Sequence, residues 1–183
     1  MTYYAQINSQ NKLISIDGSQ IVSDEYNSTD VQNIEVAEEY YENWQQYGKD
    51  YYIYENNEIV LNPEYESIKL QEAKEIKIQE NDIIRDNALI SGVTYDGILF
   101  DSDTDQKINL LATVSMMGDT DTIEWFGMNN DSLICTKQDL IAIGGLITQL
   151  HSFVWNKNAQ IKELINNAQT IEEVNAIEID YTK

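Results

Sequence analysis

The chain has very few of the residues that build covalent or metal-bound frameworks. It contains one cysteine, Cys135, and one proline, Pro63, in 183 residues. A single cysteine excludes an intrachain disulfide and any zinc site made of several cysteines. The hydrophobic share of 42% is sufficient for a packed core, so we expect a folded chain that needs no such cross-links.

Basic residues are scarce as well. The chain has 11 lysines and arginines against 32 aspartates and glutamates, which gives a formal net charge of −21. Binding to nucleic acid or to an anionic membrane surface relies on clustered positive charge, so we expect neither partner. The acidity suits either high solubility or a basic protein partner.

Long apolar runs are missing too. No stretch approaches the roughly 18 apolar residues of a membrane-spanning helix. Residues 1–12 show neither the basic start nor the apolar core of a secretory signal. We therefore expect no membrane partner and a protein that stays in a cytoplasm.

The first 62 residues carry the signals of a small, β-rich α+β unit. Residues 3–7 and 12–16 have the composition of two strands joined by a polar turn. Residues 35–48 predict a short helix that Gly48 closes, and Asn56-Asn57 predicts the turn of a hairpin.

Residues 63–90 predict a long connecting helix. Asn62 suits its N-cap, Pro63 its first position and Glu64 the positive end of its dipole. At 1.5 Å per residue the helix would span roughly 40 Å. Its apolar residues form no regular coiled-coil seam, so it either packs on its own chain or packs weakly on a neighbour.

Residues 91–183 predict a C-terminal domain of two β-hairpins packed with helices. The hairpins turn at Asp96-Gly97 and near residues 129–131. A helix over 104–118, closed by Gly118, separates them. A long helix follows from a capping box at Thr136 and Asp139, and Thr170 with Glu173 caps a last short helix. The whole chain is therefore predicted to be of the α+β class.

Three aspartates at alternate positions, Asp101, Asp103 and Asp105, have three interpretations: a helix cap, a calcium site or a catalytic carboxylate cluster. A calcium loop needs glycine at its sixth position and glutamate at its twelfth, where this chain has Gln106 and Ala112. We favour capping and predict no metal site.

No catalytic or cofactor-binding residues are predicted. His151 is the one histidine, and no nucleophile elbow, paired-histidine or phosphate-loop motif is present. We expect a helix-surface or packing role for His151 and a buried apolar role for Cys135. Gly144-Gly145 lies inside a predicted helix, where glycine is unfavourable, and indicates close backbone packing within the chain or with another helix.

Tyrosine is unevenly distributed, since ten of the 12 tyrosines fall in residues 1–65. Aromatic side chains of this kind serve both protein interfaces and the cores of small sheets, and the sequence leaves both roles open. The interface candidates are Tyr40, Tyr41, Trp44, Tyr47, Tyr51, Tyr52 and Tyr54.

The C-terminal part resembles a domain family found in tail and tail-fibre-associated proteins of tailed bacteriophages. The resemblance covers residues 70–180, from "GVTYDGILFDSD" through "IEWFGMNNDSLICT" to the "AQTIEEV" tail. The residues that carry it are Gly97, Phe100, Asp101, Asp103, Trp125, Thr136 and Leu140.

This resemblance implies a non-enzymatic tail protein at the baseplate or tail-fibre level. Its partners would be other tail or tail-fibre proteins and further copies of itself, and its location the virion tail, reached through the host cytoplasm. A tail-fibre assembly chaperone that is absent from the mature virion is an alternative. A metal-dependent hydrolase and a carbohydrate-binding module are alternatives of other classes.

Overall fold

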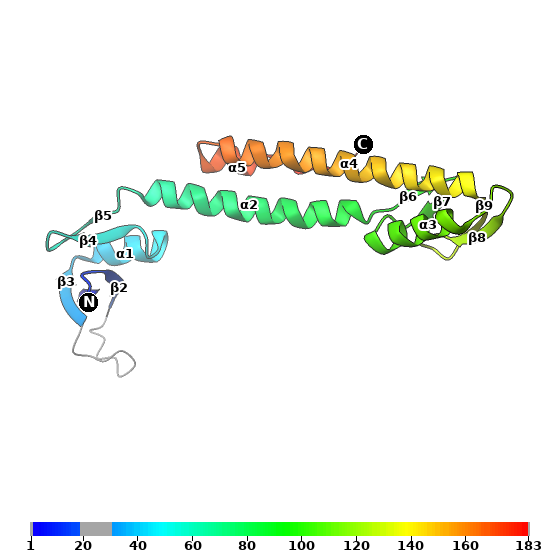
Figure 1. Ribbon diagram of the computed structural model, residues 1–183. Coiled ribbons are helices and arrows are strands. Elements are labelled where there is room, and N and C mark those ends of the chain that lie inside the picture. The colour runs from blue at the N-terminus through cyan, green and yellow to red at the C-terminus, as the bar shows by residue number, and fades with distance from the viewer. Residues whose placement is uncertain (1, 19–30, 183) are drawn as a thin grey trace. The chain divides into compact units, whose positions relative to one another are not determined.

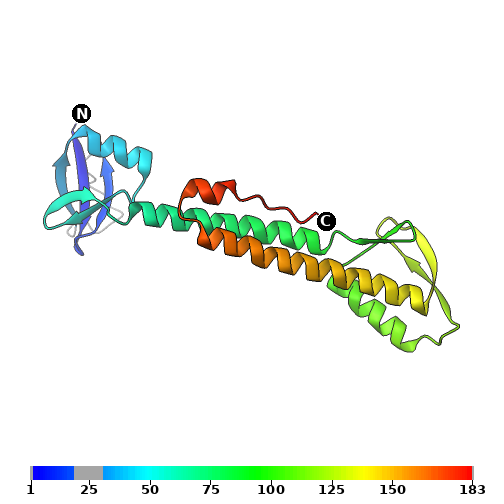
Figure 2. The same cartoon turned by 90° about the horizontal axis from the view of Figure 1, so that it is seen from above.

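Two compact units make up the chain in its computed structural model, which describes residues 2–18 and 31–182 (Figure 1, Figure 2). Unit 1 is Met1–Gln71 and unit 2 is Glu72–Lys183. Both contain helices and strands, which confirms the predicted α+β class. The boundary falls inside helix α2, and the predicted division at residues 62 and 90 stays a prediction.

In residues 2–18 and 31–64, unit 1 combines a three-stranded antiparallel sheet with one helix and a separate hairpin. Its elements are β1 (Tyr3–Asn8), β2 (Leu13–Asp17), β3 (Val31–Val36), α1 (Glu38–Tyr47), β4 (Tyr52–Glu55) and β5 (Glu58–Leu61). The sheet order is β2-β1-β3, so β1 is the central strand and buries Ala5 and Ile7 completely.

Strand β3 was not predicted, and it shortens the expected helix. The sequence placed a helix over residues 35–48, but Glu35 and Val36 pair with Tyr4 and Tyr3 of β1. Sheet pairing therefore overrides the local helical pattern at these two positions. The predicted helix end is confirmed, because Gly48 has a φ of +86° and its amide donates to the Trp44 carbonyl at 2.9 Å.

The hairpin of unit 1 turns as predicted. Asn56 and Asn57 have φ values of 52° and 66°. Two successive positive φ angles are what a two-residue turn of the favoured hairpin type requires, and asparagine tolerates them better than most residues.

Helix α2 (Tyr65–Leu89) starts two residues later than the predicted residue 63, after an Asn62 side chain that accepts the Glu64 amide at 3.0 Å. Within unit 2 it lies beside α4 (Lys137–Asn167), and the two helices run antiparallel (Figure 1, Figure 2). Lys74 Nζ donates to the Asn166 carbonyl at 2.8 Å near one end of this helix pair. The predicted connecting helix thus packs on its own chain from residue 72 onward.

The remaining elements of unit 2 are two hairpins and three further helices. They are β6 (Val93–Tyr95), β7 (Ile98–Phe100), α3 (Thr104–Met116), β8 (Thr122–Phe126), β9 (Ser132–Thr136), α4 and α5 (Ile171–Ala176). Both predicted hairpin turns are confirmed, with positive φ at Asp96, Gly97 and Asn130.

The hairpins meet each other closely at one glycine. A side chain at Gly127 would place its Cβ 2.5 Å from the Leu99 carbonyl oxygen of β7. The next amide, of Met128, donates to that same oxygen at 2.8 Å. Glycine is therefore required where the second hairpin crosses the first.

An aliphatic core holds the hairpins against α3 and α4. Its buried members are Val93, Phe100, Leu110, Cys135, Leu140, Ile143 and Ile147. Strand β9 alternates around this core: Leu133 and Cys135 face inward, whereas Ile134 is 63% exposed. Each element thus buries one face, as the period-two and helical patterns predict.

One predicted helix end is wrong. Helix α3 ends at Met116, and Met117 follows in an extended conformation with φ −76° and ψ 136°. Gly118 therefore does not close the helix in a left-handed conformation. Its amide instead donates to the Asp121 carboxylate at 2.7 Å, inside a surface turn.

The other caps agree with the sequence. Thr136 accepts the Asp139 amide, and the Asp139 carboxylate accepts the Thr136 amide at 2.8 Å, which completes the predicted capping box of α4. Thr170 caps α5 through the Glu173 amide at 3.1 Å. Among residues 2–18 and 31–182, no helix is long and apolar enough to cross a bilayer.

Candidate protein-interaction surfaces

Asp101, Asp103 and Asp105 lie around the start of α3. Asp103 is the N-cap, and its carboxylate accepts the Gln106 amide at 2.7 Å. Asp105 lies in the first turn, where a negative charge favours the helix dipole. The capping interpretation is thus confirmed for Asp103. In the described ranges, no group of three or more His, Cys, Asp or Glu side chains is arranged to hold a metal ion.

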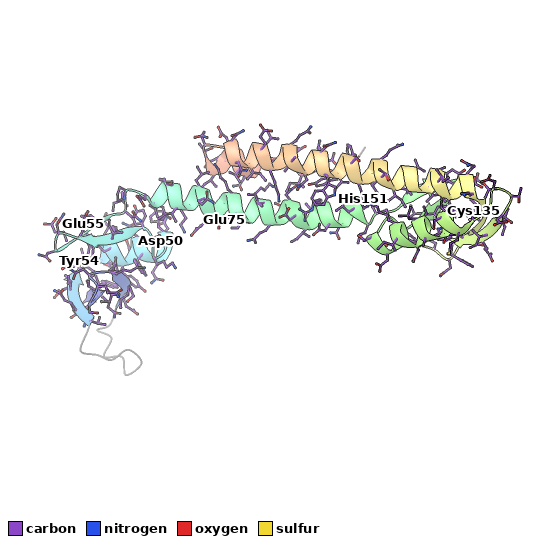
Figure 3. The ribbon with its side chains drawn as sticks, viewed as in Figure 1. Asp50, Tyr54, Glu55, Glu75, Cys135 and His151 are labelled. Atoms are coloured by element: carbon purple, nitrogen blue, oxygen red, sulfur yellow. The ribbon has the colours of Figure 1, made fainter. Side chains whose placement is uncertain are left out.

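His151 fastens the end of α2 to the segment before α3 (Figure 3). Its Nε2 lies 2.8 Å from the Ser102 carbonyl and 3.2 Å from the Leu89 carbonyl. Because both neighbours only accept, Nε2 carries the proton, and Nδ1 is left as the acceptor facing Lys107 Nζ at 3.4 Å. This is the packing role predicted for the histidine.

Cys135 is buried inside the core of unit 2, as predicted (Figure 3). Burial raises the pKa of its thiol, which disfavours the thiolate that a nucleophile requires. The residue therefore packs as a small apolar side chain.

A buried polar layer joins α2, α4 and the C-terminal tail, and sequence reasoning missed it. Asn81 Nδ2 donates to Asn158 Oδ1 at 2.7 Å, and the Tyr181 hydroxyl donates to Asn81 Oδ1 at 2.7 Å. Asn81 is 0% exposed and Asn158 is 7% exposed. The available signal was Asn81 itself, an uncharged polar residue in the inward stripe of a helix that lacked a clean apolar seam.

Charged groups flank this layer. Lys162 pairs with Asp82 across the two helices at 2.7 Å, and the Arg85 guanidinium lies 5.0 Å from the centre of the Trp155 ring. Long charged side chains, whose aliphatic parts pack between the helices, thus replace part of the apolar contact between α2 and α4.

The seven aromatic candidates of unit 1 lie together, and most of them contact one another. The rings of Tyr47 and Tyr51 stack at 4.4 Å between centroids, and those of Tyr40 and Tyr52 are 5.1 Å apart. Tyr41, Trp44, Tyr51 and Tyr54 also pack against the buried core of the sheet. Tyr52 is 9% exposed and the other six are half-buried.

These contacts give the aromatic residues a packing role. Burial raises the pKa of Tyr52, whose hydroxyl accepts a hydrogen bond from Asn43 at 2.7 Å. A simultaneous interface role for the half-buried rings stays a prediction.

A small polar pocket of about 250 Å³ lies next to these aromatic residues. Its lining includes Lys12, Lys49, Asn11, Asn62 and Tyr54. Two of the chain's 11 basic residues therefore share one pocket, beside a tyrosine ring.

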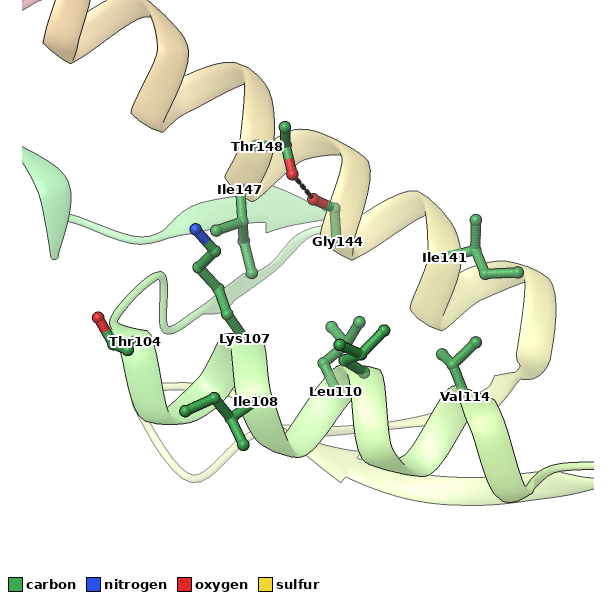
Figure 4. Close-up of a pocket in the computed structure, with 10 residues that line it drawn as sticks. Thr104, Lys107, Ile108, Leu110, Val114, Ile141, Gly144, Ile147 and Thr148 are labelled. Carbon is green, nitrogen blue, oxygen red and sulfur yellow. Dashed lines mark hydrogen bonds between the residues drawn. The ribbon is translucent and has the colours of Figure 1, made fainter.

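An apolar groove of about 490 Å³ lies between α3 and α4 (Figure 4). Its walls are formed mainly by aliphatic side chains, with Lys107 and Thr148 at the margin. Ile108 is 60% exposed, Leu111 69% and Ile141 45%. Large apolar side chains left open to water in this way are typical of binding surfaces.

The predicted glycine contact lies at the floor of this groove. A Cβ at Gly144 would approach Leu110 Cδ2 of α3 to 3.1 Å, so α3 packs closely here. Gly145 has no atom within 4 Å of its Cβ position. Close packing within the chain is thus found at Gly144 and not at Gly145.

Unit 2 coincides with a known family of domains. Residues 72–182 match a family described as "Domain of unknown function (DUF4376)". Because this match covers more than half of the chain, the protein belongs to that family. No curated protein and no solved structure matches the chain.

Proposed function

We propose that the chain is a non-enzymatic structural protein of a bacteriophage tail, at the baseplate or tail-fibre level, and that it acts through protein–protein contacts. The observation that carries the contact function is the groove between α3 and α4, where Ile108, Leu111 and Ile141 are exposed. The tail location rests on the sequence resemblance over residues 70–180.

The rest of unit 2 suits a scaffold for such a surface. The α2–α4 pair is fixed by the polar layer, and His151 holds the start of the α3 segment against it. These contacts give the groove a defined geometry before any partner binds, which lowers the entropy cost of association.

The test is a mass-spectrometric inventory of purified mature particles of the virus that encodes the chain, with copy number. We expect the protein at a fixed stoichiometry. If it is absent from particles but co-purifies with a fibre protein from the lysate, the assembly chaperone replaces the structural role. Tyr40, Trp44 and Tyr51 would then be the first residues to substitute.

A carbohydrate-binding role of unit 1 is a second candidate, favoured by the polar pocket. Lysines and asparagines beside the half-buried ring of Tyr54, with Asp50 in the same lining, supply the hydrogen-bonding groups and the stacking surface that sugars use. A glycan array with the full chain tests it, with Lys49→Glu as the variant that should lose binding. An array with no signal would remove this candidate.

The hydrolase alternative depends on Asp101, Asp103 and Asp105 acting together. Asp103 is already engaged in capping α3. Titration calorimetry with Ca²⁺ and Mg²⁺ should show no tight binding, and an Asp103→Ala variant should differ from wild type only in stability.

A further inference from the structure

Five polar or aromatic side chains form a stripe along α4 where this helix passes α3. They recur at spacings of three and four residues, so they share one face of the helix. The stripe consists of Thr148, His151, Ser152, Trp155 and Asn156. Together with Lys107 of α3 it lines a pocket of about 440 Å³, which we call the Trp155 pocket. Figure 4 shows Lys107 and Thr148, which this pocket shares with the neighbouring apolar groove.

The Trp155 pocket lacks negative charge in a chain that is rich in it. None of the described residues that line it is Asp or Glu, and α4 has neither residue type from position 140 to position 162. Within residues 2–18 and 31–182, the Lys107 ammonium forms no ion pair with a carboxylate. The pocket therefore presents one positive charge that the described part of the chain does not pair, and this charge suits a ligand with a negative group.

Two groups of the pocket are held in place before any ligand binds. His151 is fixed by its bonds to two backbone carbonyls, and its Nδ1 lies 3.4 Å from Lys107 Nζ. An ammonium has three N–H donors, so Lys107 keeps two for a ligand after one is directed at His151. The Trp155 ring is 50% exposed and lies 5.0 Å from the Arg85 guanidinium, which pairs with Asp86 at 2.7 Å. Fixed groups of this kind lower the entropy cost of binding.

We propose that the Trp155 pocket binds a sugar that carries a carboxylate, that is, a hexuronic acid. The carboxylate accepts a charge-assisted hydrogen bond from Lys107. The C–H groups of the sugar ring pack on the exposed part of the Trp155 ring, whose π-face is negative. Sugar hydroxyls bond to Ser152 and Asn156, which both donate and accept. An aromatic surface with a few convergent polar groups is the usual composition of a small-molecule site. This site goes beyond the proposed protein contacts and does not depend on them.

The charge of the whole chain limits the ligand to one with few negative groups. A polyanion would bring many charges close to a protein of net charge −21. A single carboxylate bound at Lys107 avoids most of this repulsion, because charges beyond about 8 Å are largely screened at physiological salt. A small inorganic anion would use Lys107 and leave Trp155 without a contact. A neutral sugar would use Trp155 and leave the Lys107 charge unpaired.

The test is a titration of the full chain with glucuronate and, separately, with glucose at constant ionic strength. Two-dimensional NMR follows the indole N–H signals of the three tryptophans, and a Trp155→Phe variant assigns the signal of Trp155. We expect a saturable shift of that signal with a Kd on the order of 1 mM for glucuronate. Glucose should bind about tenfold more weakly, because it lacks the charge-assisted contact with Lys107.

Two lysine variants locate the charge that matters. Lys107→Met should remove the tenfold preference for glucuronate, because the side chain keeps its length and loses its charge. Lys107 is exposed, so the variant should fold, which circular dichroism checks. The matched control is Lys157→Met, which removes a positive charge two residues from Trp155 but outside the pocket lining, and should keep the preference.

Several results would overturn the inference. They are a Trp155 signal that does not respond up to about 50 mM glucuronate, glucose that binds as well as glucuronate, and a preference that survives Lys107→Met. A shift confined to Trp44 would place the binding in unit 1 and would also reject the Trp155 pocket. Sodium acetate serves as a bare carboxylate, and binding as tight as that of glucuronate would reject the sugar as the ligand.

Discussion

The two units build their cores from different residue types. Unit 1 buries Ala5, Ile7 and Ile16 in its sheet and surrounds them with half-buried tyrosine rings. Unit 2 buries a row of isoleucines along α4 and interrupts it with paired asparagines. Tyrosine keeps a polar hydroxyl at the surface of a small core, so unit 1 needs few fully buried groups. Unit 2 has long helices that must be kept in register.

The two units also differ in how much of their apolar surface is exposed to solvent. In unit 1 the aromatic rings cover one another, with stacked pairs at 4.4 and 4.5 Å between centroids. In unit 2 the apolar side chains of Ile108, Leu111 and Met116 on α3 are 60%, 69% and 81% exposed. The aromatic residues, for which the sequence left packing and interface roles open, thus contact one another within unit 1, whereas these apolar residues of α3 are exposed.

The largest effect should come from the aliphatic core. Ile147 is 1% exposed, and Ile147→Ala should lower the free energy of unfolding of unit 2 by about 2–5 kcal/mol, from lost transfer energy and a residual cavity. Hydrogen exchange by mass spectrometry should show the loss of protection in residues 72–182 and unchanged protection in the sheet of unit 1. The control, Ile83→Ala at a side chain that is 64% exposed, should change stability by less than about 0.5 kcal/mol. Equal loss in both units would show that they do not have separate cores.

The next largest loss of stability should come from the buried polar layer of Asn81, Asn158 and Tyr181. Asn81→Ala removes the amide donor to Asn158 Oδ1 and the nearer acceptor of the Tyr181 hydroxyl, which keeps only its 3.4 Å contact with Asn158 Oδ1, and should cost about 1–3 kcal/mol, measured by urea denaturation. A double substitution, Asn81→Leu with Asn158→Leu, removes both buried amides and leaves only the half-buried Tyr181 hydroxyl to bond water, so it should recover much of that loss. If the single and double variants are equally unstable, the asparagine pair is not what couples the helices.

Helix caps differ between the units and allow a paired test. Helix α4 starts with a complete capping box, whereas α1 starts at Ala37 with no side-chain cap. Thr136→Ala should cost about 1 kcal/mol in unit 2, and Ala37→Asp should stabilise unit 1 by a similar amount, because Ala37 already has the extended conformation of a cap. Thermal denaturation should show a lower midpoint for Thr136→Ala and a higher one for Ala37→Asp. Shifts in the same direction would contradict the different capping of the two helices.

The capping box of Thr136 and Asp139 also predicts that the stability of unit 2 depends on pH. Hydrogen bonds from Thr136 and Tyr95 lower the pKa of Asp139 below that of the unfolded chain. A lowered folded-state pKa gives stability that is complete above the unfolded value of about 3.9 and is lost as the pH falls through the folded value. Asp139→Asn should therefore lower the urea midpoint at pH 7, and its difference from wild type should shrink toward pH 3.

The sequence predicted the elements that rest on local signals. The turns at Asn56-Asn57 and Asp96-Gly97 and the box at Thr136 depend on neighbouring residues, so their chemistry is visible in the chain. Strand β3 was missed because its pairing with β1 is a long-range contact. The Asn81–Asn158 pair joins positions 77 residues apart, so no local sequence pattern predicts it.

The exposed apolar face of α3, which includes Ile108, Leu111 and Met116, escaped prediction for a related reason. Its leucines and isoleucines are ordinary core residues in composition, and only the fold shows which of them face the core and which face water. Leu110 and Leu111 are neighbours in the chain, yet one is 7% exposed and the other 69%. The absence of charge over residues 108–118 and 140–156 was the visible signal, and it gains meaning once both segments are found on facing helices.

The smallest expected change in stability concerns two adjacent glycines of α4, of which Gly144 packs closely on α3 and Gly145 does not. Gly145→Ala meets nothing within 4 Å and should stabilise α4 by about 0.5–1 kcal/mol, because alanine restricts the unfolded chain and favours the helix. At Gly144 the new methyl would lie 3.1 Å from Leu110, so Gly144→Ala should gain less or lose stability. Thermal denaturation of the two variants under identical conditions measures the difference. If Gly144→Ala proves the more stabilising, then α3 yields easily at Leu110, and the groove is not the preformed surface that the proposed function requires.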